Sequence, residues 1–178
     1  MNLRLVSVAI ALILSAMLLG AGVYESVIVA PNFQGAPISL EHACGFYHAA
    51  NPGMFFRVLS PAVQLFLLLA LVCNWRPSAT RWRLAGALAF AILADVITFR
   101  FHYPRNAILF SAPLTNPPAD FDRVATEWAM GNYVRIAVVL TMVVLVMVST
   151  PATARREKES PSRKGSRAIS SQVTSGAG

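Results

Sequence analysis

Residues 84–103 read LAGALAFAILADVITFRFHY, and their only ionisable side chains lie in the second half of the stretch. A helix of this length crosses the hydrocarbon core of a bilayer, which takes about 20 residues at about 1.5 Å each. No part of the stretch shows the alternation of polar and apolar residues that is typical of a barrel strand. Three other stretches share its length and character: Leu5–Ala30, Met54–Asn74 and Trp128–Thr150. The sequence therefore predicts an all-α integral membrane four-helix bundle.

The composition agrees with this fold class. Hydrophobic residue types make up 56% of the 178 residues and charged types only 13%, which is too apolar for an ordinary soluble domain. Residues 151–178 hold six of the 15 lysines and arginines, so this segment supplies most of the net charge of +7. We therefore expect residues 1–150 to form the bundle, residues 151–178 to be a disordered, basic, serine-rich tail, and no nucleic-acid partner to be involved.

Prolines and apolar length set the expected limits of the helices. Pro104 is expected to end the third helix, and Pro61 to bend the second and open space beside Gln64. The first stretch loosely mimics a signal peptide. It runs past Glu25 to Ala30, however, well beyond an h-region of roughly 7–15 residues, so we expect it to be retained as a span.

The basic residues predict the orientation, because short loops rich in lysine and arginine remain cytoplasmic. The connection at 74–83 contains three arginines and no acid, and the tail is basic, whereas the loop at 31–53 contains neither lysine nor arginine. In the loop at 104–127, two arginines stand against three acids. We therefore expect a multi-pass protein of the cell membrane with both termini cytoplasmic.

Ionisable side chains inside three of the spans indicate a functional site, since such groups are costly in a membrane and normally face the bundle interior. Asp95 lies eight residues before the end of the third span, and Arg135 seven residues after the start of the fourth. Both should therefore sit about 10–12 Å below the outer boundary, and we expect them to contact each other. Glu25 lies in the outer third of the first span, within reach of Arg100 or His102.

Helical spacing gathers these groups on two facing stripes. Asp95, Thr98 and His102 share one face of the third helix. Trp128, Asn132 and Arg135 share one face of the fourth. The spacing predicts a polar pocket in the outer half of an apolar bundle. The alternative is a pair of interhelical ion pairs that fix helix register, with Arg100 and His102 reaching to the headgroups.

A metal site is a second interpretation of the same end of the bundle. Glu41, Cys44 and His48 would share one face of a short interfacial helix, and His102 would emerge on the same side of the membrane. These residue types bind zinc or copper. Their spacing matches no tight ligand motif, however, so the sequence assigns no metal ligand.

Four short motifs together resemble the anthrone-oxygenase-like family of small four-helix membrane proteins, most of which are domains of unknown function. The likeness covers about residues 1–150. The motifs are GVYES at 22–26, NPGMFF at 51–56, FHYPRN at 101–106 and WAMGNYVR at 128–135. The resemblance implies that a polar cavity is lined by Asn106, Asn132 and Arg135. It also implies oxidation of anthrones to anthraquinones by dioxygen without an established cofactor.

The leading functional hypothesis is therefore an oxidoreductase-like activity on a lipophilic phenolic substrate. Glu25 or His102 would remove a proton, and Arg135 with Asn132 would stabilise the oxyanion. The residues expected to bind substrate are Asp95, Asn106, Trp128 and Asn132.

Two other functions stay open from the sequence. In the first, the same polar cluster binds a lipid or a partner membrane helix without catalysis. In the second, the chain is a transporter protomer, which would require a homo-oligomer because four spans with no inverted repeat do not form a transport pathway alone.

Overall fold

The computed structural model describes residues 3–33, 52–76, 79–110 and 119–150, and within these ranges all regular secondary structure is helical. The fourth of these ranges is mostly one helix, whereas the first and third are each interrupted by a wider turn. The elements are α1 (Leu3–Tyr24), η1 (Glu25–Val29), η2 (Ala30–Phe33), α3 (Pro52–Cys73), α4 (Ala79–Ile97), η3 (Thr98–His102), α5 (Tyr103–Leu109) and α6 (Phe121–Met147).

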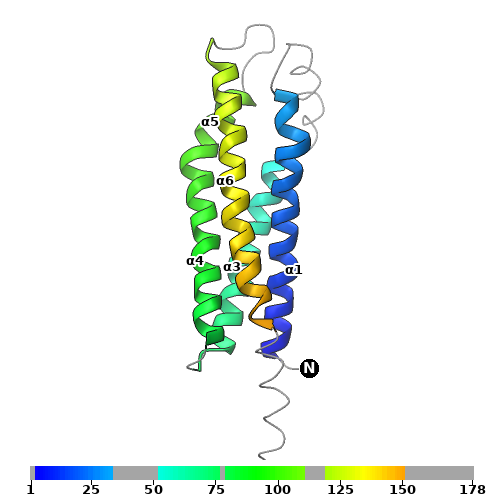
Figure 1. Ribbon diagram of the computed structural model, residues 1–178, viewed down its shortest axis with the longest axis vertical. Helices are drawn as coiled ribbons and strands as arrows, with labels where there is room; N and C mark the ends of the chain where they lie inside the picture. The colour runs from blue at the N-terminus through cyan, green and yellow to red at the C-terminus, as the bar shows by residue number, and fades with distance from the viewer. Residues whose placement is uncertain (1–2, 34–51, 77–78, 111–118, 151–178) are drawn as a thin grey trace, which may run out of the picture.

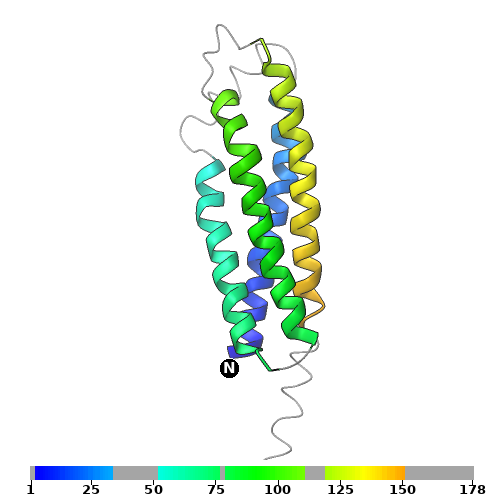
Figure 2. The same ribbon diagram turned by 90° about the vertical axis from the view of Figure 1, so that its left-hand side faces the viewer.

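The predicted four-helix arrangement is confirmed. Helices α1, α3, α4 and α6 run side by side along the long axis of the molecule (Figures 1 and 2). We call the end that holds the N-terminus and the α3–α4 connection the lower end, and the end where α6 begins the upper end. Figure 2 shows that α3 starts well below the upper ends of α5 and α6. Among the described residues, helices therefore surround the upper half of the bundle less completely than the lower half.

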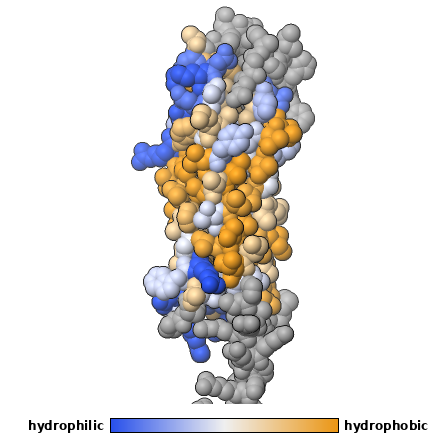
Figure 3. All heavy atoms as spheres, in the orientation of Figure 1, coloured by the Kyte–Doolittle hydropathy of each residue, from blue (hydrophilic) through white to orange (hydrophobic). Residues whose placement is uncertain are grey.

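In the part of the chain that the structure describes, four helical segments are long and apolar enough to cross a membrane: Leu3–Asn32, Gly53–Cys73, Ala79–Leu109 and Phe121–Met147. Large apolar side chains such as Ile13, Val58 and Leu65 are exposed on their outer faces. Figure 3 shows such side chains gathered across the middle of one face, with hydrophilic residues above and below. This distribution suits a hydrocarbon environment, because in water an apolar belt of this size would be costly.

The third and fourth helices extend further than predicted. Pro104 does not end the third helix, which continues to Leu109. The reason is that Pro104 lies in the first turn of α5, where a missing N–H is tolerated. Helix α6 begins at Phe121, two turns before the predicted start, and in these polar first turns Arg123 pairs with Asp120 and Glu127.

Two apolar clusters hold the bundle together. The larger lies in the lower half and contains fully buried side chains from all four helices, among them Val8, Leu67, Leu84 and Met142. The smaller lies at the upper end around Trp128, where η1, α5 and α6 meet. The space between the two clusters is bordered by polar residues, and this is where the candidate site lies.

Candidate functional site

A cavity of about 700 Å³ opens between the two apolar clusters and is lined by residues of all four long apolar helical segments. This volume falls within the range of roughly 300–1,000 Å³ that is typical of small-molecule sites. Its walls include all but one of the predicted site residues: Glu25, Asp95, His102, Asn106, Trp128 and Arg135. These six predicted residues thus line one cavity, which is bordered below by Leu18, Ala94 and Val139.

Glu25 and Arg135 form an ion pair across the cavity wall, between η1 and α6. Each side chain is only 11% exposed. The guanidinium of Arg135 also lies over the ring of Phe56, 5.1 Å from its centroid. Three helices therefore meet at one buried charge pair, which is expected to be costly to break because either partner alone would be an uncompensated charge.

The predicted contact between Asp95 and Arg135 is wrong. The carboxylate of Asp95 instead accepts hydrogen bonds from Ser60 Oγ and Gln64 Nε2, each at 2.6 Å. Matched depth and inward-facing helical stripes suggested the ion pair, but donors on α3 engage both carboxylate oxygens instead. Asp95 therefore ties α4 to α3 at the floor of the cavity, and Ser60 is a site residue that the sequence did not indicate.

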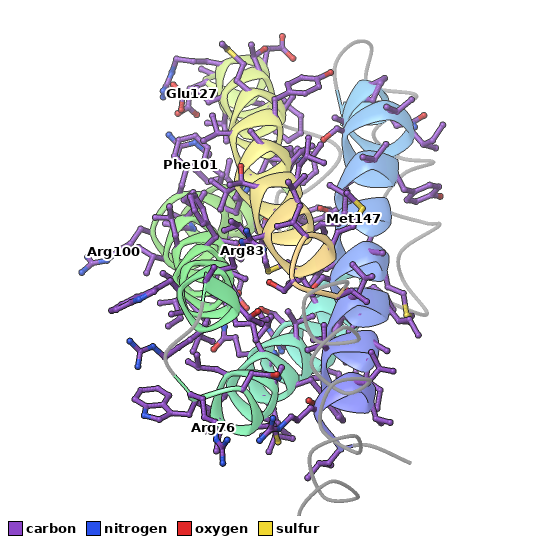
Figure 4. The ribbon with its side chains drawn as sticks, turned by 60° about the horizontal axis from the view of Figure 1, so that its bottom comes forward. Arg76, Arg83, Arg100, Phe101, Glu127 and Met147 are labelled. Atoms are coloured by element: carbon purple, nitrogen blue, oxygen red, sulfur yellow. The ribbon has the colours of Figure 1, made fainter. Side chains whose placement is uncertain are left out.

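The expected partners of Glu25 also differ from those observed. Arg100 is exposed and points away from the bundle (Figure 4), and Arg135 occupies the place beside Glu25 that Arg100 or His102 was expected to take.

The wide turn of η1 begins at Glu25, where the N–H of Ala30 bonds to the Glu25 carbonyl. Such a turn rotates the residues after it relative to a regular helix, and π-turns of this kind are frequent at functional sites.

A second wide turn, η3, ends at His102, and this side chain is buried at 1% exposure. Its ring packs edge to face against Trp128, with centroids 6.0 Å apart. Within the described part of the chain, neither ring nitrogen makes a hydrogen bond of normal geometry, although the ring lies close enough to the Gly131 backbone to interact with it. Buried polar atoms are normally hydrogen-bonded, so an imidazole of this kind in a cavity wall is suited to bind a ligand or water.

Gly131 provides the space for His102. A side chain at this position would overlap the ring of Phe101, and its Cβ would lie 3.2 Å from His102 Cε1. The backbone of α6 can therefore approach η3 closely only because residue 131 is glycine. The sequence interpretation missed Gly131, although a glycine between Trp128 and Asn132 on the polar stripe is a signal of such close packing.

Trp128 and Asn106 close the upper part of the cavity. The indole Nε1 donates a hydrogen bond of 2.7 Å to Asn106 Oδ1, which joins α6 to α5. Because this bond occupies the amide oxygen, the Asn106 amide nitrogen is the group that can donate to a ligand. Both residues had been predicted to bind substrate, and both line the cavity.

Asn132 is the one predicted site residue that does not line the cavity. It is fully buried, and neither of its amide atoms has a partner among the described residues. The shared stripe with Trp128 and Arg135 correctly predicted that Asn132 faces inward. It could not show whether the side chain would reach the cavity space or lie within the helix packing.

The proposed metal ligands Glu41, Cys44 and His48 lie outside the described residues. Among the residues that the structure does describe, no group of three or more histidine, cysteine, aspartate or glutamate side chains is placed to hold a metal ion.

Ion pairs fix the upper end of the bundle above the cavity. Arg105 on α5 donates from Nη2 to Glu127 on α6 at 2.7 Å, and its guanidinium lies 3.6 Å from the centroid of Phe101. Arg123 pairs with Glu127 and with Asp120. Of these contacts, the pair of Arg105 and Glu127 joins α5 to α6, as the hydrogen bond between Asn106 and Trp128 also does.

Comparisons of the chain with protein-family models, with curated proteins and with solved structures gave no significant match. The resemblance to the anthrone-oxygenase-like family therefore stays a prediction that rests on the four short motifs.

Proposed function

We propose that this chain binds a lipophilic phenolic molecule in the cavity and promotes its oxidation by dioxygen. The proposal rests above all on His102, a buried imidazole in the cavity wall that makes no hydrogen bond of normal geometry in the described part of the chain. A neutral imidazole offers one nitrogen that accepts a proton, which is the property required of a general base. The apolar surroundings favour a ligand that partitions into lipid.

Arg135 is the residue that stabilises negative charge on the ligand. It lines the same cavity as His102, and Glu25 together with the ring of Phe56 holds its guanidinium in place. A preorganised cation in a site that excludes water stabilises a developing oxyanion strongly. Since Glu25 is engaged by Arg135, we assign proton removal to His102 and the positioning of Arg135 to Glu25.

The reaction class comes from the family resemblance. A phenolic anthrone carries an acidic CH₂ group opposite its carbonyl, and His102 removes one proton from it to give an enolate. The oxygen of this enolate lies at Arg135. The enolate carbon then forms a bond to dioxygen, and loss of water leaves a second carbonyl. In sum, CH₂ and O₂ become C=O and H₂O, so the substrate is oxidised and dioxygen is reduced.

We propose further that the protein lies in the cell membrane with its lower end and both termini in the cytoplasm. At the upper end, Arg105 and Arg123 are paired with acids. The lower end of the described chain carries Arg76, Arg81 and Arg83 without any aspartate or glutamate nearby in sequence or in ion-pair contact. Uncompensated arginines favour the cytoplasmic side.

Dioxygen uptake by the purified protein with a soluble anthrone tests the proposed reaction. We expect uptake and quinone formation in equal amounts, loss of both in His102→Phe, and full activity after removal of residues 155–178. Circular dichroism and thermal unfolding check that the variant is folded. Unchanged turnover in folded His102→Phe would contradict the assignment.

A lipid-binding protein without catalysis is the second candidate. It is favoured by the internal pairing of the carboxylates, since Glu25 and Asp95 both have partners within the protein. Stoichiometric binding of a phenol without any dioxygen uptake would support this candidate over the first.

A further inference from the structure

The cavity opens sideways, between α3 and the α4–α5 segment. The residues of its wall that belong to α1 and α6 are buried or half-buried, whereas its exposed wall residues all lie on the other two segments. They are Arg57, Pro61, Phe99, Tyr103 and Ala107. We call this rim the lateral mouth.

The lateral mouth lies in the apolar belt of the bundle. Val58 and Val96, which neighbour the rim on α3 and α4, are 74% and 49% exposed. Phe99 and Tyr103 pack edge to face at 5.0 Å and form an aromatic border on one side. A molecule dissolved in the bilayer can therefore reach the cavity without crossing the polar upper end of the bundle.

Arg57 is the one charged residue of the rim. It lies in the second turn of α3, about 8 Å along the helix from Pro52 at 1.5 Å per residue. Among the described residues, no carboxylate lies within ion-pair distance of its guanidinium. The two acids of the cavity are engaged elsewhere, Glu25 by Arg135 and Asp95 by Ser60 and Gln64.

We infer that the ligand enters from the bilayer through the lateral mouth and that Arg57 binds a carboxylate on it. The ligand class is thus a lipophilic carboxylic acid, with its apolar part in the cavity and its anionic group at the rim. A planar guanidinium matches a carboxylate in geometry and in charge, and a single arginine suits a single negative charge. The inference rests on the proposed function in one respect, namely that the cavity holds a lipophilic ligand.

Arg100 supplies a matched control. It is also an exposed arginine of a membrane-spanning segment, and it directly follows Phe99 of the rim, but it does not line the cavity and points away from the bundle (Figure 4). If both arginines only reached toward the lipid headgroups, replacing either one would have the same effect on ligand binding. A specific carboxylate contact distinguishes Arg57 from Arg100.

The test compares two probes that differ by one carboxylate, 2-naphthol and 3-hydroxy-2-naphthoate, with full-length protein in neutral phosphatidylcholine nanodiscs. We expect wild type to bind the naphthoate about tenfold more tightly than the naphthol, which is about 1.4 kcal/mol. Arg57→Gln should bring this ratio close to one and leave naphthol affinity unchanged. Arg100→Gln should keep the wild-type ratio. Because Arg57 is exposed, its replacement should not disturb folding.

Four outcomes would overturn the inference. A ratio near one in wild type, with both probes bound, rejects the carboxylate contact and leaves the proposed function standing. An equal loss of preference in Arg57→Gln and Arg100→Gln assigns the effect to general surface charge. Loss of the preference in phosphatidylglycerol nanodiscs would assign Arg57 to a lipid headgroup. If neither probe binds, the proposed function fails as well.

Discussion

The lower and upper halves of this bundle are built from the same four helical segments but in different ways. In the lower half, Leu67, Leu84 and Met142 are fully buried in one continuous apolar cluster. In the upper half, two helices carry wide turns and the walls enclose a cavity with an ion pair, a buried carboxylate and a histidine. The difference indicates that the lower half is held by continuous apolar packing, whereas the upper half gives up part of that packing to enclose a cavity.

The largest expected effect comes from breaking the upper half at its ion pair. Arg135→Met leaves Glu25 as an uncompensated buried charge, so we expect a loss of roughly 3–5 kcal/mol in the free energy of unfolding. Glu25→Gln with Arg135→Met should recover much of this loss. Thermal or denaturant unfolding in detergent measures both. Strict additivity of the two changes would show that the pair is not coupled.

A cavity made in the lower half should lower the free energy of unfolding by a similar or smaller amount and leave the candidate site intact. Leu67→Ala removes a fully buried side chain from the apolar cluster and should destabilise the bundle by about 2–5 kcal/mol. At a temperature where the variant is folded, its affinity for 2-naphthol should equal that of wild type. A large change in affinity would contradict the division between the halves.

A methyl group added at Gly131 should disturb the site more than the fold. Gly131→Ala forces Phe101 and His102 to move, with an overpacking cost of about 1–3 kcal/mol. We expect the affinity for 2-naphthol to fall, since His102 shifts relative to the cavity. Gly20→Ala is the matched control on α1, because a Cβ there meets nothing within 4 Å. Equal affinities of the two variants would argue against a role for His102 in binding.

The smallest effect is expected from the exposed ion pairs at the upper end. The side chain of Arg123 is 62% exposed, so Arg123→Gln should leave the melting temperature and naphthol binding unchanged within error. A clear loss of binding would indicate that these charges act on the ligand.

The four long apolar helices and the gathering of polar groups at one cavity could be predicted from the sequence, but not the partner of each group. Counting residues at 1.5 Å each placed Asp95 and Arg135 at one depth, and both line the cavity. Residue counting could not show that Asp95 would bind Ser60 and Gln64 and not Arg135. The choice depends on how α3 is rotated about its own axis, which is set by packing.

The wide turns explain the remaining differences. No residue pattern specifies a π-turn, yet η1 begins at Glu25 and η3 ends at His102. Each wide turn rotates the residues that follow it about the helix axis. A stripe drawn for a regular helix therefore predicts the wrong face for residues beyond the turn. This also accounts for the continuation of the third helix through Pro104, which falls in the first turn after η3.

The most direct test of the cavity as the working site is to fill it and measure binding. Thr98→Trp places a large side chain at a half-buried position of the cavity wall, whereas Thr141→Trp places the same side chain on the exposed face of α6. The two threonines are matched, since each donates a hydrogen bond of 2.9 Å to the carbonyl four residues before it.

Binding of 2-naphthol to wild type and to these two variants, in nanodiscs and with folding checked by circular dichroism, provides the measurement. We expect one molecule to bind per wild-type chain, the same for Thr141→Trp, and none for Thr98→Trp. Wild-type affinity in folded Thr98→Trp would contradict the account, because the ligand would then bind outside the cavity.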